Sequence, residues 1–220
     1  MEAERSLADK SVTHPASLFD LKTLPKFGKL SINEPVAIAY PLGDITASYL
    51  SCVLPCNILP VSESSRHEAS LKEYASISLL CHLLSITEGP IYGRIRGRGL
   101  AYGAHLTVSL WNGLLTFAVD DSTGPAEAFF VFKQLMAEVD ECFSAEGYDS
   151  LISEEALNVA KSALIFQLIE ERSTPSSLQT VLLRSSLRGI PMAASSDADD
   201  PVLSCIKDCQ LLDLKAAWLK

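Results

Sequence analysis

The sequence predicts an α+β domain in which helices pack on one face of an antiparallel sheet. The main sign of a sheet is Asn112-Gly113, a tight-turn pair between two runs rich in β-branched and aromatic residues. Apolar residues recur at helical spacing before and after this hairpin. The resulting order of strands, helix, hairpin and further helices is typical of a segregated α+β fold. We expect residues 34–220 to form the domain and residues 1–33 to be a linker or an incomplete preceding segment.

The first strands and the first helix are expected before residue 90. Partial alternation of apolar residues over 36–61, broken by prolines, indicates strands with proline at their ends or edges. Ser65 and Glu68 have capping-box spacing, so a helix should follow and stop near Gly89-Pro90. The side chains expected on its buried face are Tyr74, Ile77, Cys81 and Leu84.

A short helical turn and the hairpin come next. The turn is expected over residues 91–96, with Gly97 at its end, and the hairpin over residues 100–119. Pro125 suits the first turn of a following helix. The apolar stripe of that helix is predicted to be core packing rather than a cofactor site, and it consists of Phe129, Phe132, Met136, Val139 and Phe143.

The C-terminal third is predicted to be helical. Ser153 is a candidate N-cap of a helix that Thr174-Pro175 ends, and a shorter helix should run to residues 189–191. Residues 194–201 are expected to form an acidic surface loop. One more amphipathic pattern over residues 203–220 continues to the last residue, so we expect the domain to be truncated at its end.

Composition limits the classes of partner. A chain of 220 residues with 48% hydrophobic and 20% charged side chains is typical of a soluble globular protein. Its net charge of −9 argues against nucleic acid. No apolar run is long enough to span a membrane, and residues 1–10 resemble neither a secretory signal nor a mitochondrial presequence. We expect a cytoplasmic protein, or a mitochondrial one if a targeting segment lies upstream of a fragment.

Most residues able to do chemistry have a structural explanation. The six cysteines are expected to be reduced thiols, and although Cys205 and Cys209 would share a helix face, their spacing is a weak zinc signal. The four histidines form no zinc motif: His67 lies in the capping box, His82 on an apolar helix, and His105 could point either way from its strand. The paired carboxylates are expected on solvated helix faces, and they are Glu154, Glu155, Glu170 and Glu171.

Residues 88–104, EGPIYGRIRGRGLAYGA, are the exception. Four glycines let the backbone turn sharply between a cation, Arg96, and a phenol, Tyr102. Such a pair can hold a peptide carbonyl. Taken alone, Arg96 could instead be a charge at a helix C-terminus and Tyr102 a half-buried strand aromatic.

This stretch resembles the C-terminal half of the pitrilysin/insulinase metallopeptidases, the inverted zincins, and among them the presequence-protease-like branch. The hairpin ending in GLLTFAVDDS, the proline-led helix and the ERSTP break are similar in order to that family's last repeat. The resemblance covers roughly residues 34–215, with only residues 88–104 highly specific.

The resemblance implies a zinc metalloendopeptidase of two halves that hydrolyses unfolded peptides. In it the N-terminal half carries H-x-x-E-H and zinc, and the positions matching Arg96 and Tyr102 contact the substrate backbone and stabilise the oxyanion. This chain has no H-x-x-E-H. We therefore expect a fragment, or a subunit that needs a metallopeptidase half in cis or in trans, to bind no metal and to be inactive alone. The alternative is a non-catalytic subunit that acts as a scaffold or binds substrate.

Overall fold

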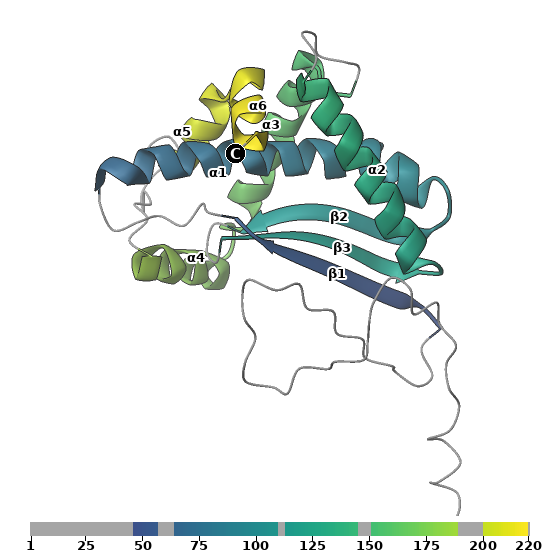
Figure 1. Cartoon of the computed structure of the whole chain (residues 1–220). Coiled ribbons are helices and arrows are strands. Elements are labelled where there is room, and N and C mark those ends of the chain that lie inside the picture. Colours follow the sequence, from purple (N-terminus) through teal and green to yellow (C-terminus); the bar gives the residue numbers. More distant parts are fainter. Residues whose placement is uncertain (1–45, 57–63, 110–112, 145–150, 189–199, 220) are drawn as a thin grey trace, which may run out of the picture. The chain divides into compact units, whose positions relative to one another are not determined.

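A three-stranded antiparallel sheet lies at the centre of the fold (Figure 1). The computed structural model describes residues 46–56, 64–109, 113–144, 151–188 and 200–219, and residues Ala47–Lys220 form one unit. The strands, with β3 in the middle, are β1 (Ser48–Pro55), β2 (Ala101–Ser109) and β3 (Leu114–Ser122). Helices α1 (Ser64–Ser85) and α2 (Pro125–Ser144) lie on one side of the sheet (Figure 1), which confirms the predicted α+β class.

Successive side chains of a strand point to opposite faces of the sheet, so every second side chain faces the helices. Phe117 of β3 is paired with Leu106 of β2 and with Cys52 of β1, so the three side chains lie on one face. Phe117 and Leu106 are buried. β1 is an edge strand of the described sheet and ends at Pro55, as the proline positions predicted. The turn at residues 111–112 and the expected strands at 36–45 and 57–61 lie outside the described residues.

The long helix α1 (Ser64–Ser85) packs along β2. Tyr74, Cys81 and Leu84 are buried, as predicted, because three- and four-residue steps return to the same side of a helix. The capping-box side chains at Ser65 and Glu68 lie outside the described part.

Helix α2 (Pro125–Ser144) begins at the predicted proline, but its buried face is rotated from the predicted one. Val139 and Phe143 are buried, whereas Phe129 and Phe132 are only half-buried. The Phe132 ring stacks on Phe117 of the sheet with 3.8 Å between centroids. Phe129, Phe132 and Met136 are partly buried and pack against the core, so the predicted stripe does contribute to core packing. The fully buried face is Ala128, Val131, Leu135, Val139, Cys142 and Phe143.

Helix α3 (Glu154–Glu170) has the predicted cap, since the Ser153 hydroxyl accepts a hydrogen bond from the Ala156 backbone N–H at 3.1 Å. Its inner side chains Leu157 and Leu164 are buried. The preceding helix ends at Glu170, before the predicted break at Thr174-Pro175, and helix α4 (Pro175–Arg188) begins at that proline. The predicted end of α4 at residues 189–191 lies outside the described residues.

The last amphipathic pattern forms two helices rather than one, which corrects the prediction. They are α5 (Pro201–Asp208) and α6 (Leu211–Trp218), separated by Cys209 and Gln210 in extended conformations. Cys209 therefore does not share a helix face with Cys205, because the helix ends between them. The Gln210 side chain and Asp213 form a capping box that starts α6, a signal that the sequence contained.

The prediction of an acidic surface loop over residues 194–201 is wrong at Asp200, because this residue is only 1% exposed. Its Oδ1 accepts hydrogen bonds from the backbone N–H groups of Val202 and Leu203, and its Oδ2 pairs with Arg172. Asp200 is thus the N-cap of α5. Residues 194–199 lie outside the described part.

Candidate functional site

The predicted turn before the hairpin is a single π-helical turn, η1 (Tyr92–Arg96). The Gly97 backbone N–H donates to the Tyr92 carbonyl at 3.0 Å, and the Leu100 N–H donates to the Ile95 carbonyl at 3.1 Å. Ile91 and Ile95 are buried and fix the turn to the core. Because these two residues point inward, Arg96 lies on the outer side, where it is exposed. Such wide turns are uncommon and are often found at functional sites.

Two glycines allow the chain to leave this turn and enter β2. A Cβ atom added at Gly97 would lie 2.3 Å from the Gly93 carbonyl oxygen, so only glycine fits there. Gly99 has φ +71°, a conformation that other residues adopt at a cost. The backbone path between Arg96 and Tyr102 therefore depends on glycine, as the sequence indicated.

Arg96 lies close to two tyrosine rings. Its guanidinium carbon is 4.5 Å from the centroid of the Tyr102 ring and 5.1 Å from that of Tyr92. Both distances are within the range of cation–π attraction, worth about 0.5–1 kcal/mol each at exposed sites. The structure brings the two predicted residues together and adds Tyr92, which the sequence analysis did not single out. The signal was available, because residues four apart meet on one side of a helical turn.

The polar groups of this stack are available to a ligand. Tyr102 is 66% exposed and Arg96 is exposed. Within the described part of the chain, no carboxylate pairs with Arg96 and no group hydrogen-bonds the Tyr102 hydroxyl. A guanidinium attracted to a ring face keeps its N–H groups as hydrogen-bond donors. The arrangement can donate several hydrogen bonds to carbonyl or carboxylate oxygens.

The neighbouring arginine has a structural role. Arg94 forms a two-pronged hydrogen-bonded ion pair with Glu138 of α2, which fastens η1 to that helix. The hydrogen bond from Arg94 is the main cause that lowers the pKa of Glu138. Arg94 is therefore largely neutralised and adds little positive potential to the site.

Polar residues at the same end of the sheet lie close to Tyr102. The flanking pairs Ala101–Ser122 and Gly103–Asp120 put Tyr102 opposite Asp121 of β3. The Tyr49 hydroxyl of β1 donates to Asp121 at 2.6 Å, and this bond raises the pKa of Tyr49. Asp121 has φ +49°, an uncommon conformation for a residue with a side chain.

The remaining candidates are dispersed. His105 points toward Asp120, with 3.5 Å between Nδ1 and Oδ2, and burial lowers the pKa of His82. No disulfide joins the six cysteines, and burial raises the pKa of Cys81 and Cys56. In residues 46–56, 64–109, 113–144, 151–188 and 200–219, no group of three or more histidine, cysteine or acidic side chains could hold a metal ion. The described residues therefore do not fit a zinc site. His14 and the His67 side chain lie outside that part.

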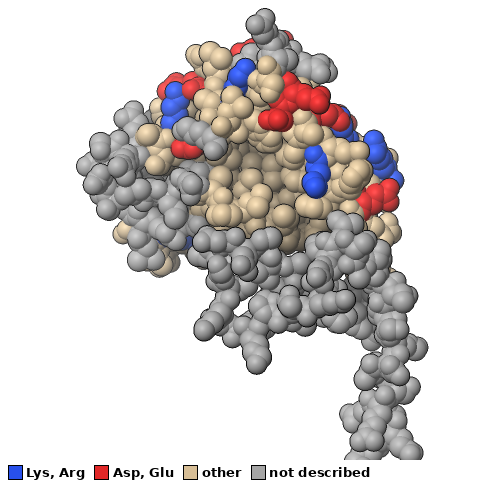
Figure 2. All heavy atoms as spheres, viewed as in Figure 1, with Lys and Arg blue, Asp and Glu red and all other residues tan. Residues whose placement is uncertain are grey.

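Acidic and basic side chains are both present on the face seen in Figure 2. Acidic side chains gather over the C-terminal part of α2, which contains Glu138, Asp140 and Glu141, and the middle of the face is uncharged. The carboxylates at the ends of α3 are exposed, as predicted. None of the helices in the described ranges is long and apolar enough to cross a membrane.

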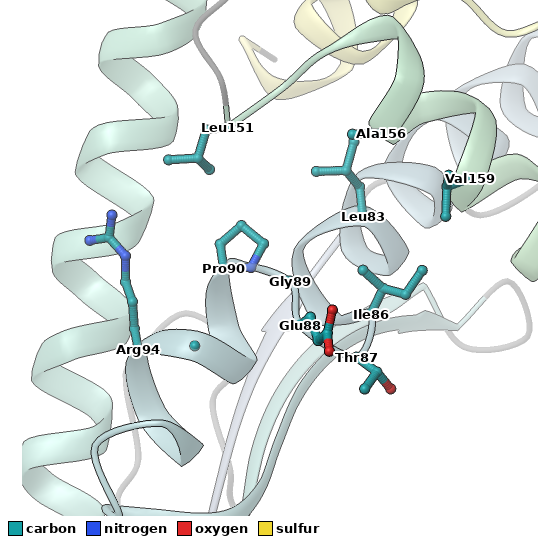
Figure 3. A pocket seen from close by; sticks show the side chains of 11 residues that line it. Leu83, Ile86, Thr87, Glu88, Gly89, Pro90, Arg94, Leu151, Ala156 and Val159 are labelled. Carbon is teal, nitrogen blue, oxygen red and sulfur yellow. The ribbon is translucent and has the colours of Figure 1, made fainter.

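A groove of about 550 Å³ lies apart from the stack (Figure 3). Leu83 lies at the end of α1, Ile86 follows that helix, and the first part of α3 supplies Ala156 and Val159. Arg94 borders the groove and extends toward α2 in Figure 3. The groove is mainly apolar and contains neither Arg96 nor Tyr102, so it is a separate surface feature.

No family model and no curated protein matches the sequence. Solved structures are similar at low identity. The inactive peptidase domain of a Bordetella parapertussis protein described as a zinc protease is 16% identical with a TM-score of 0.51, over 79% of this chain and 86% of that one. An Alicyclobacillus acidocaldarius protein described as an M16-like peptidase is 18% identical with a TM-score of 0.52, over 69% of this chain and 33% of that one.

A protease from Helicobacter pylori is also similar, at 14% identity and a TM-score of 0.54, over 94% of this chain and 49% of that one. The chain thus spans one third to one half of the length of two of these proteins. At such identities the likeness establishes the fold, which is similar to that of M16-type peptidase domains.

Proposed function

We propose that this chain is the substrate-clamping half of a two-part zinc metalloendopeptidase of the pitrilysin/insulinase type, close to its presequence-protease-like branch. The observation that carries the proposal is the exposed stack of Arg96 on Tyr102, with 4.5 Å between the guanidinium carbon and the ring centroid. The M16-like fold and the motif over residues 88–104 support the same assignment independently.

The two side chains have complementary tasks in this proposal. The Arg96 guanidinium stays protonated and donates to backbone carbonyls of an extended, unfolded peptide. The Tyr102 hydroxyl donates to the carbonyl oxygen that gains negative charge as its peptide bond is attacked. The Tyr92 ring also attracts the Arg96 guanidinium and so limits the positions that it can take. Since the sequence has no H-x-x-E-H, this proposal assigns the zinc to the other half, in cis or in trans.

The first test is peptide binding by this chain. An unstructured, fluorescein-labelled peptide is titrated with the wild-type chain and with Arg96→Met, and the anisotropy gives the Kd. A charged hydrogen bond is worth about 1.5–3 kcal/mol, so we expect binding to weaken about 10- to 100-fold. Arg98→Met is the matched control, since Arg98 is exposed in the same loop. Equal Kd values for Arg96→Met and the wild type would refute the clamp.

The second test separates catalysis from binding and needs a zinc-bearing half added to the chain. Tyr102→Phe should then lower kcat about 10²- to 10³-fold with a small change in KM, because the lost donor acts in the transition state. An unchanged kcat would rule out the oxyanion role.

A non-catalytic subunit is the second candidate, because one of the similar domains is described as inactive. In that case Arg96→Met would weaken peptide binding and no added half would produce cleavage.

A further inference from the structure

Helix α3 is apolar on two opposite sides. Its inner side chains, Leu157, Ala160 and Leu164, are buried in the core. Its outer side nevertheless carries Val159, 57% exposed, and Phe166, 67% exposed. A helix that is apolar all round is normally covered on all sides, and exposed apolar patches are typical of interaction sites. The outer side of α3 is therefore a candidate contact surface.

The outer side has the spacing of one continuous helix face. Five exposed residues lie at i, i+4, i+7, i+11 and i+15, which keeps them in line along the helix. They are Glu155, Val159, Ser162, Phe166 and Glu170. Ile169, 40% exposed, widens the apolar part. The Ser162 hydroxyl donates to the Asn158 carbonyl at 3.0 Å, so its hydrogen-bonding need is met within the helix. We call these five residues and Ile169 the α3 outer face.

A groove continues this face at its N-terminal end. Val159 belongs to both, and the groove adds Ala156 beside Leu83, Ile86 and Leu151 (Figure 3). A volume of about 550 Å³ exceeds what one large apolar side chain needs. A partner lying along α3 could thus insert an aromatic or leucine side chain at this end.

The acidic residues at the two ends of the α3 outer face indicate which kind of partner can bind there. Glu155 and Glu170 lie on the outer face, one before and one after its apolar residues, and at 1.5 Å per residue they are about 22 Å apart. A second copy of α3, packed parallel or antiparallel, would put these glutamates against glutamates, which is repulsive. An anionic membrane surface would be repelled for the same reason.

We propose that the α3 outer face binds an amphipathic helix of a partner protein that carries an apolar stripe with lysine or arginine at both ends. The binding is of the helix-in-groove type, in which apolar side chains at i, i+3, i+4 and i+7 provide affinity. The flanking basic residues pair with Glu155 and Glu170 and set the position of the partner along α3. This surface is separate from the Arg96–Tyr102 stack and does not depend on the proposed peptidase function.

The experiment uses three synthetic helical peptides of equal length: a leucine-striped peptide with lysine at both ends, the same stripe with glutamate at both ends, and a scrambled control. Fluorescence anisotropy with the full chain should give saturable binding of the lysine-ended peptide only. Phe166→Gln should weaken it about 10- to 100-fold, the effect of one lost aromatic contact. Phe130→Gln is the control, since Phe130 is 59% exposed but lies on α2.

Charge reversal makes the test specific. The double variant Glu155→Lys and Glu170→Lys should prefer the glutamate-ended peptide. Both residues and Phe166 are exposed, so the variants should keep the wild-type circular dichroism spectrum. The proposal is wrong if the lysine-ended peptide does not bind, if both charged peptides bind equally, or if Phe130→Gln weakens binding as much as Phe166→Gln. Sedimentation showing a dimer that Phe166→Gln dissociates would assign the face to a second copy instead.

Discussion

Replacing Asp200 by alanine should be one of the most destabilising single changes in the described part of this chain. The carboxylate is 1% exposed, and Oδ1 accepts from the backbone N–H groups of Val202 at 2.7 Å and Leu203 at 3.2 Å. Oδ2 accepts from the guanidinium of Arg172, whose side chain is only 12% exposed. One side chain therefore starts α5 and also neutralises a cation at the end of α3.

The structure sets the size of the effect. Loss of an N-cap costs about 1 kcal/mol, and leaving one member of a buried ion pair without its partner costs about 3–5 kcal/mol in total. We expect Asp200→Ala to lower the free energy of unfolding by about 3–5 kcal/mol and the Tm by about 10 °C. Asp200→Asn keeps a good capping side chain and loses only the charge, so its loss should be smaller, about 1–3 kcal/mol.

Urea unfolding followed by circular dichroism measures both variants. Asp208→Asn is the control, because this exposed carboxylate lies on the same helix; a change within about 0.5 kcal/mol is expected. Adding Arg172→Met to Asp200→Asn should recover stability, since the cation then no longer lacks its partner. A loss below about 1 kcal/mol for Asp200→Ala would refute the reasoning that this pair holds α5 to α3.

Two further predictions concern the segment that carries the stack. Gly97→Ala should lower the free energy of unfolding in urea by more than about 2 kcal/mol, because its Cβ would lie 2.3 Å from the Gly93 carbonyl oxygen. A Cβ added at Gly93 would meet no atom within 4 Å, so Gly93→Ala should change the free energy of unfolding by less than about 1 kcal/mol. Glu138 has a lowered pKa, so its ion pair stabilises the fold above the ordinary glutamate pKa of about 4.3 and is lost as the pH falls through the lower folded value. The Tm difference between wild type and Glu138→Gln should accordingly shrink between pH 5 and 3, and a constant difference would contradict this role.

Local signals predicted much of this fold because their causes lie within a few residues. The Ser153 cap, the proline at the start of α2 and the glycines after η1 act on their own backbone. Long-range packing explains where the prediction of elements was incomplete. The fully buried face of α2 is shifted from the predicted stripe, since Phe129, Phe132 and Met136 are only partly buried against the core.

The candidate site divides in the same way. The sequence alone identified Arg96 and Tyr102 as the candidate site residues, because glycine spacing and residue type can be read directly from it. The tertiary structure decided that the Arg96 guanidinium lies close to the rings of Tyr92 and Tyr102 and that Arg94 is paired with Glu138. It also buried Asp200, which the sequence had indicated to be in a surface loop. Electrostatic partners and burial depend on elements distant in sequence, so only the folded chain could reveal them.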